Sequence, residues 1–182
     1  MEEFNTIEKA KELFRSVGDE SEEKCIIFAY YDTTKEAMQA GIVGGAFAGA
    51  GAIGGAIAGA VIGGTKQQPT YIFNELNNRR DGYLIKLTNN GIGIIPLDND
   101  GIMWSFSSAK LKPNLSSYFF ISFEQIQSII VKDLNIFNKS IKRIKIVLIN
   151  NQNLCLLSKV NLKQMPYQTE NLAKFVEQYQ NK

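Results

Sequence analysis

The sequence contains no histidine, and its 182 residues include only two cysteines, four prolines and one tryptophan. Without histidine the chain cannot use Ser-His-Asp or Cys-His nucleophile activation, and it cannot bind zinc through imidazole ligands. The two cysteines, Cys25 and Cys155, are too few for a disulfide framework, and the sequence leaves their redox state open. Both lie within apolar runs, which indicates small buried thiols.

The chain also lacks the motifs of the common catalytic and metal sites. No pair of carboxylates or hydroxyls has a spacing that argues for general acid/base chemistry. The glycine-rich stretch has neither the GKS/GKT ending of a phosphate loop nor a G-x-G-x-x-G motif in a βαβ unit. Residues 98–101 (DNDG) lack the regular acidic ligands and the closing glutamate of a calcium loop. We therefore expect a non-enzymatic protein with no cofactor and no metal.

The net charge of +2 conceals an asymmetry along the chain. Residues 1–36 carry ten acidic and five basic residues, whereas residues 79–182 carry fourteen basic and seven acidic residues. A basic surface can be merely solvated, or it can favour an anionic lipid surface. The predicted contact with anionic lipid is the cluster Lys142, Arg143 and Lys145. Nucleic-acid binding is not expected, because no recognisable module interleaves basic and exposed aromatic residues.

The most unusual stretch is residues 41–64, GIVGGAFAGAGAIGGAIAGAVIGG, in which every residue is Gly, Ala or a larger apolar residue. Two series of glycines with four-residue spacing run through it, Gly41, Gly45, Gly49 and then Gly51, Gly55, Gly59, Gly63. Four residues make about one turn of α-helix, so each series forms a stripe along which another helix can approach closely. The pattern resembles the glycine-zipper segments of bacterial membrane and surface proteins.

Around this stretch the hydrophobic periodicity predicts an α+β domain. Residues 2–17 have the period of an amphipathic helix, and Gly18 is expected to cap its C-terminus. Residues 25–31 (CIIFAYY) are expected to form a buried strand. Residues 83–97 are expected to form a β-hairpin, because the turn sequence N-N-G separates two alternating runs.

The rest of the chain continues in the same antiparallel pattern. A short alternating run at residues 102–106 precedes an expected polar loop at residues 107–117. Further strands are predicted at residues 118–123, 126–131, 141–149 and 154–160. From Thr169, the predicted N-cap, the period changes to that of a closing helix. The whole pattern predicts six or seven short antiparallel strands with a helix at each end of the chain.

From residue 83 onward this order of elements resembles the bacterial pleckstrin-homology-like (PH-like) domains. The resemblance lies in the sequence segments YLIKLTNNGIGIIPL, ISFEQIQSIIV and IKRIKIVLINNQNLCLLSKV, followed by the amphipathic helix. The resemblance implies a small antiparallel barrel or sandwich built from residues 24–32 and 83–182. It makes residues 1–18 an added N-terminal helix, residues 36–65 an insertion between the first two strands, and residues 66–82 a connector.

In the better-known PH-like members the loop between the first two strands carries basic residues that bind phosphoinositides. Here Lys66, Arg79, Arg80 and Lys86 are too scattered to match that pattern. The resemblance therefore implies the fold without implying a phosphoinositide site.

Three structures compete for the glycine-rich insertion. A soluble helix would lose about 10 kcal/mol through its ten glycines, and an exposed apolar loop would aggregate. A single transmembrane helix of 24 residues would span about 36 Å, but it would separate strand 25–31 from its sheet. A helical hairpin that turns near Gly49-Ala50-Gly51 keeps both ends on one side. We expect the hairpin, packed into lipid or against protein.

The combined prediction is a membrane-associated protein on the cytoplasmic face, whose PH-like domain presents a hairpin for membrane insertion or self-association. The acidic, amphipathic N-terminus MEEFNTIEKAKELF does not have the features of a secretory signal. Two alternatives remain open at this stage. The chain could be a soluble adaptor that oligomerises through the hairpin, or a pore-forming effector.

Overall fold

The computed structural model describes residues 2–32, 82–99, 111–135, 137–150 and 153–179. The helical elements are η1 (Glu2–Phe4), α1 (Ile7–Ser16), η3 (Leu115–Ser117), η4 (Phe123–Gln125) and α4 (Gln168–Tyr179). The strands are β1 (Glu23–Tyr31), β2 (Gly82–Thr88), β3 (Gly91–Asn99), β4 (Leu111–Pro113), β5 (Phe119–Ser122), β6 (Ile126–Asn135), β7 (Asn138–Leu148) and β8 (Asn153–Lys159). The predicted α+β class is confirmed.

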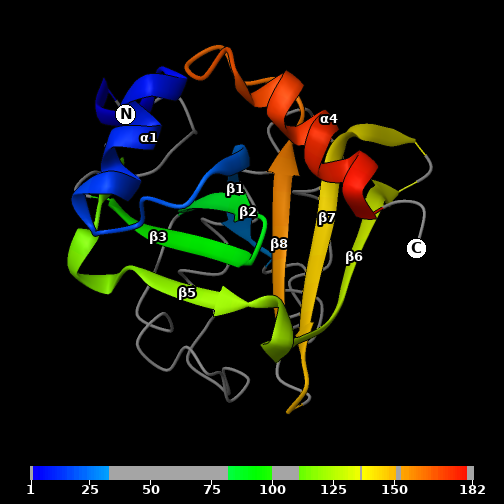
Figure 1. The fold of residues 1–182 in the computed structure, drawn as a ribbon. Helices are drawn as coiled ribbons and strands as arrows, with labels where there is room; N and C mark the ends of the chain where they lie inside the picture. The colour runs from blue at the N-terminus through cyan, green and yellow to red at the C-terminus, as the bar shows by residue number, and fades with distance from the viewer. Residues whose placement is uncertain (1, 33–81, 100–110, 136, 151–152, 180–182) are drawn as a thin grey trace.

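All eight described strands belong to one antiparallel sheet. Their order is β4-β3-β2-β1-β8-β7-β6, and β5 also pairs with β3. The first strand joins the two halves of the sheet: residues 25–29 pair with β2, whereas Tyr30 and Tyr31 pair with β8. Figure 1 shows β2, β3 and β5 running across the direction of β6, β7 and β8. The predicted pairing of strand 25–31 with strand 83–88 is therefore confirmed.

Two hydrophobic cores lie on opposite faces of β1 and β2. The first, between the two halves of the sheet and α4, contains Ile27 and Ile85. The second lies between the other face of the sheet and α1, and it contains Ile26, Phe28 and Leu84. Each fully buried side chain of this size contributes about 1.5–3 kcal/mol of transfer free energy. Burial on both faces explains why the first strand is continuously apolar rather than alternating.

The N-terminal helix α1 begins at Ile7, later than the predicted start at residue 2, whereas its C-terminal end lies where Gly18 was expected to cap it. At its start the Thr6 side chain accepts a hydrogen bond from the backbone N–H of Lys9 at 3.3 Å. At its end Gly18 has a φ of +82°, a conformation that glycine adopts without strain. Phe14 on the inner face of α1 is fully buried in the second core.

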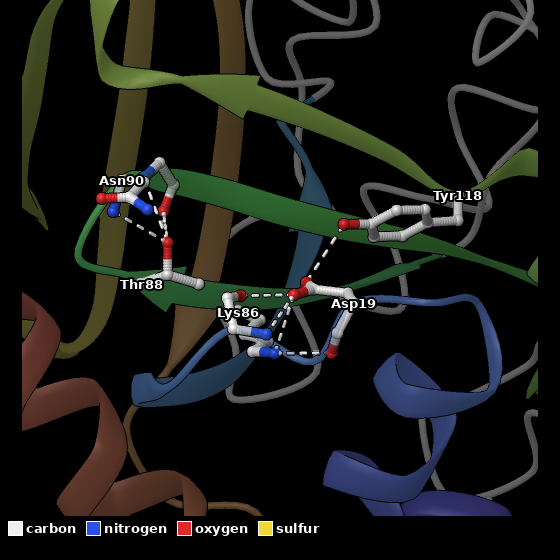
Figure 2. Close-up of polar contacts among 7 residues, drawn as sticks. Asp19, Lys86, Thr88, Asn90 and Tyr118 are labelled. Atoms are coloured by element: carbon white, nitrogen blue, oxygen red, sulfur yellow. Dashed lines mark hydrogen bonds and ion pairs between the residues drawn. The ribbon is translucent and has the colours of Figure 1, made fainter.

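The N-N-G hairpin between β2 and β3 is confirmed, and the side chain of Thr88 holds it (Figure 2). The Thr88 hydroxyl donates to the carbonyl of Gly91 at 3.0 Å and accepts from the backbone N–H groups of Asn90 and Gly91, each at 3.1 Å. The turn also touches the rest of the sheet, because the N–H of Phe123 donates to the Asn90 carbonyl at 2.9 Å.

Side chains of the C-terminal helix form hydrogen bonds to backbone groups of β1, as a neighbouring strand would. The side-chain oxygen of Asn171 accepts from the N–H of Ile26 at 2.9 Å, and that of Gln168 accepts from the N–H of Phe28 at 2.9 Å. The Gln168 amide also donates to the Phe28 carbonyl at 3.1 Å and to the Ser158 hydroxyl at 2.9 Å. These side chains of α4 thus satisfy strand backbone groups that neither β2 nor β8 reaches.

Several other details of the sequence prediction are wrong. The structure describes eight strands rather than the predicted six or seven. Thr169 is not the N-cap, because α4 already begins at Gln168 and the Thr169 hydroxyl donates to the Val160 carbonyl. The expected loop at residues 107–117 contains β4, whose proline is tolerated because β4 is an edge strand. Gly82 belongs to β2 rather than to the connector. The alternating run at residues 102–106 and the rest of the connector lie outside the described residues.

Candidate functional site

The most completely buried ion pair among the described residues joins Asp19, just after α1, to Lys86 on β2 (Figure 2). Their side chains are only 5% and 4% exposed, and Lys86 Nζ lies 3.0 Å from Asp19 Oδ1. The same ammonium donates to the Asp19 carbonyl at 3.0 Å. The hydroxyl of Tyr118 donates to Asp19 Oδ2 at 3.0 Å, and the N–H and hydroxyl of Ser21 donate to Oδ1.

These contacts set the charge state of the cluster. Burial raises the pKa of Asp19, but hydrogen bonds from Ser21, Lys86 and Tyr118 and the charge of Lys86 outweigh burial, so the pKa lies below its ordinary value of 3.8. Burial, together with the Asp19 charge and hydrogen bond, raises the pKa of Tyr118. Lys86 also lies over the ring of Phe14, 5.6 Å from its centroid. The cluster therefore ties α1 to β2.

A polar depression of about 180 Å³ adjoins this cluster. Its lining residues are Lys11, Arg15, Asp19, Glu20, Ser21, Glu22, Glu23 and Lys86. Both carboxylate oxygens of Asp19 are already engaged within the cluster, and Lys11 forms an ion pair with Glu23. Among the described residues no group of three or more acidic or cysteine side chains is placed to hold a metal ion. We interpret this region as a structural anchor.

The cluster makes Gly93 intolerant of a side chain. A Cβ atom at Gly93 would lie 2.7 Å from Asp19 Oδ2 and 3.2 Å from the Tyr118 hydroxyl. We expect Gly93→Ala to lower the free energy of unfolding by about 1–3 kcal/mol, because the carboxylate must move from its donors. Thermal denaturation followed by circular dichroism measures this loss. In an Asp19→Ala background the same substitution should cost much less; an undiminished cost would contradict the explanation.

The three predicted lipid-contact residues do not share one face of β7. Ile144 and Ile146 point into the first core, so Arg143 and Lys145 lie on the outer face and Lys142 on the opposite side. Lys142 pairs with Asp133 of β6 at 2.5 Å. Only two members of the predicted cluster therefore belong to the outer surface.

A lysine that sequence reasoning did not select completes that surface. Lys132 of β6 is exposed and lies directly opposite Arg143. Directly opposed like charges repel, and the Asp32 carboxylate offsets this repulsion, since its Oδ2 lies 2.7 Å from Arg143 Nε. We call Lys132, Arg143 and Lys145 the outer basic face. Alternation within QSIIVKD hints that Lys132 lies outward, but its pairing with Arg143 needs the register.

The two described residues that flank residues 33–81 are Asp32 and Gly82, and Asp32 contacts this face. Ala29 pairs with Tyr83, so Asp32 and Gly82 lie within a few residues of the same cross-strand pair. The Asp32 N–H donates to the Cys155 carbonyl at 2.9 Å, and its side chain contacts Arg143. Asp32 thus lies at the outer basic face, and Gly82 lies at the same end of β1 and β2.

The predicted hairpin at residues 36–65 lies outside the described residues. The same holds for its seven packing positions, Gly41, Gly45, Gly49, Gly51, Gly55, Gly59 and Gly63. Neither of the two described α-helices has the length and apolar character needed to cross a bilayer. The placement of the two ends is therefore what the structure contributes to the hairpin prediction.

Both cysteines are free thiols. Cys25 faces the first core, and burial raises its pKa to about 12, so it stays protonated at neutral pH. Cys155 is half-buried and lies opposite Lys145 on the outer face of the sheet. The two thiols are on opposite faces, which explains why they do not form a disulfide.

We found no matching protein-family model, no similar curated protein and no similar solved structure. The PH-like and glycine-zipper resemblances therefore rest on sequence patterns. Function has to be argued from the outer basic face and from the two ends of residues 33–81.

Proposed function

We propose that this chain is a non-enzymatic, membrane-associated protein. In this proposal a PH-like domain presents residues 36–65 as a glycine-zipper hairpin at the cytoplasmic face of a membrane. The hairpin inserts into the bilayer, and its glycine stripes allow its arms or neighbouring copies to pack closely. The observation that carries the proposal is the contact of Asp32 with Arg143, which starts residues 33–81 at the outer basic face.

The pairing of β1 with β2 favours a hairpin over a single span. A single transmembrane helix would put Asp32 and Gly82 on opposite sides of a hydrocarbon core about 30 Å thick. The pairing of Ala29 with Tyr83 puts both ends close together, which supports a hairpin with its two ends on one side of the bilayer. Hydrocarbon also favours backbone hydrogen bonding within the segment, which offsets the low helix propensity of its glycines.

The proposed finer fold is a PH-like barrel or half-open sandwich. It is supported by the antiparallel succession of strands, by β1 joining both halves of the sheet, and by α4 filling the gap between β1 and β8. Such a fold hosts many functions, so it selects no ligand. In this protein its role is to hold the two ends of the hairpin beside a basic surface.

The outer basic face would add electrostatic attraction to anionic lipid. Exposed Lys132 and half-exposed Lys145 point outward on neighbouring strands, whereas Asp32 partly neutralises Arg143. Each lysine near an anionic surface contributes about 1 kcal/mol at physiological salt. Apolar insertion and basic contact would act together, because the chain leaves the domain at this face.

A flotation assay tests the proposal. The full chain and a variant lacking residues 37–64 are mixed with vesicles of phosphatidylcholine and phosphatidylserine. We expect the full chain to float and the shortened chain to stay in the soluble fraction, because the apolar segment provides most of the binding. Circular dichroism confirms that the shortened chain is folded. If the full chain does not float, the membrane proposal is wrong.

Charge reversal tests the orientation at the bilayer. Lys145→Glu changes the local charge by two units, so we expect vesicle partitioning to fall by about 10- to 30-fold. Lys9→Glu makes the same change on exposed α1 and is expected to have little effect. Equal losses for the two variants would contradict the assigned face. A full chain that forms a defined oligomer without floating would instead favour the soluble adaptor.

A further inference from the structure

The strand β6 is the terminal strand of the sheet among the described residues. In the part of the chain that the structure describes, β6 pairs only with β7. Figure 1 shows it at the margin of the molecule, with β7 on one side. An edge strand presents unpaired N–H and C=O groups, which serve as a template for another strand. A ten-residue edge is long enough to pair over several residues.

The middle of this edge is the part suited to pairing. Register irregularities occur between Ile126 and Ser128 and between Asp133 and Asn135, so the stretch between them is regular. It contains no proline and no glycine, and its residues Ser128–Val131 are uncharged. Ile130 is 39% exposed on its outer side. Bulges protect an edge from pairing, and here they protect only its two ends.

The sequence of this stretch is suited to antiparallel pairing with the same stretch of a second copy. In an antiparallel pair centred on Ile130, Ile130 faces its own copy, Ile129 faces Val131, and Ser128 faces Lys132. Apolar residues meet apolar residues, and no like charges are opposed. Registers centred on Lys132 or Asp133 would oppose two lysines or two carboxylates. Registers centred on Ser128, Ile129 or Val131 would each set a polar residue against an isoleucine. The register centred on Ile130 is therefore favoured, and it has the two-fold symmetry of a dimer.

We propose that β6 is a self-association surface, through which two copies of this chain join their sheets in an antiparallel pair centred on Ile130. The resulting sheet continues from one copy into the other. This contact uses none of residues 33–81, so it is independent of the proposed hairpin. It also covers the most exposed apolar side chain in the interior of β6.

Site-directed cysteine cross-linking of the full chain tests the register. In a Cys155→Ser background we compare Ile130→Cys, Ser128→Cys and Lys132→Cys under mild oxidation; buried Cys25 is retained. Residue 130 opposes itself, so Ile130→Cys should give at least about tenfold more disulfide dimer than either neighbour, since only its Cβ atoms face each other. The double variant Ser128→Cys, Lys132→Cys should also cross-link efficiently, because these two positions face each other across the dimer.

Each outcome of the cross-linking experiment either supports the β6 dimer or overturns it. Efficient cross-linking of Ile130→Cys and of the double variant, with weak cross-linking of the two single neighbours, supports the β6 dimer. Equal yields at all three positions indicate random collision or association through another region, and they overturn it. No cross-linking at any position also overturns it, including the case in which a different extended chain occupies the edge. Thermal denaturation of each variant excludes misfolding as a cause.

Discussion

Replacing Lys86 with methionine is expected to lower the free energy of unfolding by about 3–5 kcal/mol and the melting temperature by roughly 6–20 °C. The substitution keeps most of the side-chain volume but leaves the Asp19 carboxylate with one fewer donor and no counter-charge. Both side chains are at least 95% buried, so water cannot readily replace the ammonium. Chemical denaturation at neutral pH measures the loss.

Acidification should narrow the difference between the Lys86→Met variant and the wild type. The folded pKa of Asp19 lies below its ordinary value of 3.8 in the wild type. Its stabilising contribution is therefore complete above about pH 5 and is lost as the pH falls through the folded pKa. In the variant the pKa of Asp19 rises, so protonation at low pH removes the buried charge that causes the destabilisation. Denaturation at pH 7, 5 and 3 follows this convergence.

Two controls separate a buried charge from a simple loss of contacts. Lys174→Met breaks the exposed ion pair with Glu170 on α4 and should change stability by less than about 0.5 kcal/mol. Combining Lys86→Met with Asp19→Asn removes both charges and should recover part of the loss. If Lys86→Met costs no more than Lys174→Met, the buried pair does not anchor α1.

The second large effect is expected for Gln168→Ala, which should lower the free energy of unfolding by about 2–5 kcal/mol. The substitution removes the acceptor for the Phe28 N–H and the donor to the Lys159 carbonyl. The Phe28 carbonyl keeps one partner, since the Ser158 hydroxyl also donates to it at 2.7 Å. The orphaned N–H is buried, and alanine leaves a cavity beside it.

Hydrogen exchange identifies where this loss occurs. In the Gln168→Ala variant we expect faster exchange in β1 than in β7, because the Phe28 N–H loses its hydrogen bond to α4. Gln178→Ala, on the exposed face of the same helix, is the matched control and should leave both strands protected. Unchanged exchange in β1 would mean that β1 is held by its pairing with β2 and β8 alone.

Hydrophobic periodicity correctly predicts those helices and strands whose apolar pattern is complete within a few residues. Helix α1, the β2–β3 hairpin and the last three strands all have such a pattern, and each is found close to its predicted position. Strand β4 was missed because it has three residues and a proline, so it forms only against β3. The start of α4 was misplaced because Gln168 is selected by contacts with β1 and β8.

The residues of the buried anchor carry no local signal. Lys86 alternates with apolar neighbours in YLIKLT, a pattern that indicates a solvent-facing lysine. It is buried because α1 covers the second face of β2, and its partner Asp19 is 67 residues away. Lys132 was missed for a related reason, since only the strand register places it opposite Arg143. Long-range pairing, which periodicity does not encode, decides both positions.

The glycine-rich stretch shows most clearly which properties are local to the sequence and which depend on the tertiary structure. Composition and spacing are enough to establish that residues 41–64 are wholly apolar and carry two glycine stripes, because both properties are local to the chain. Where the surrounding segment begins and ends depends on which strands pair. The pairing of Ala29 with Tyr83 brings its two ends close together, and the contact of Asp32 with Arg143 puts the first end beside a basic surface. That pairing joins residues 54 positions apart in the sequence, so only the tertiary structure could decide it.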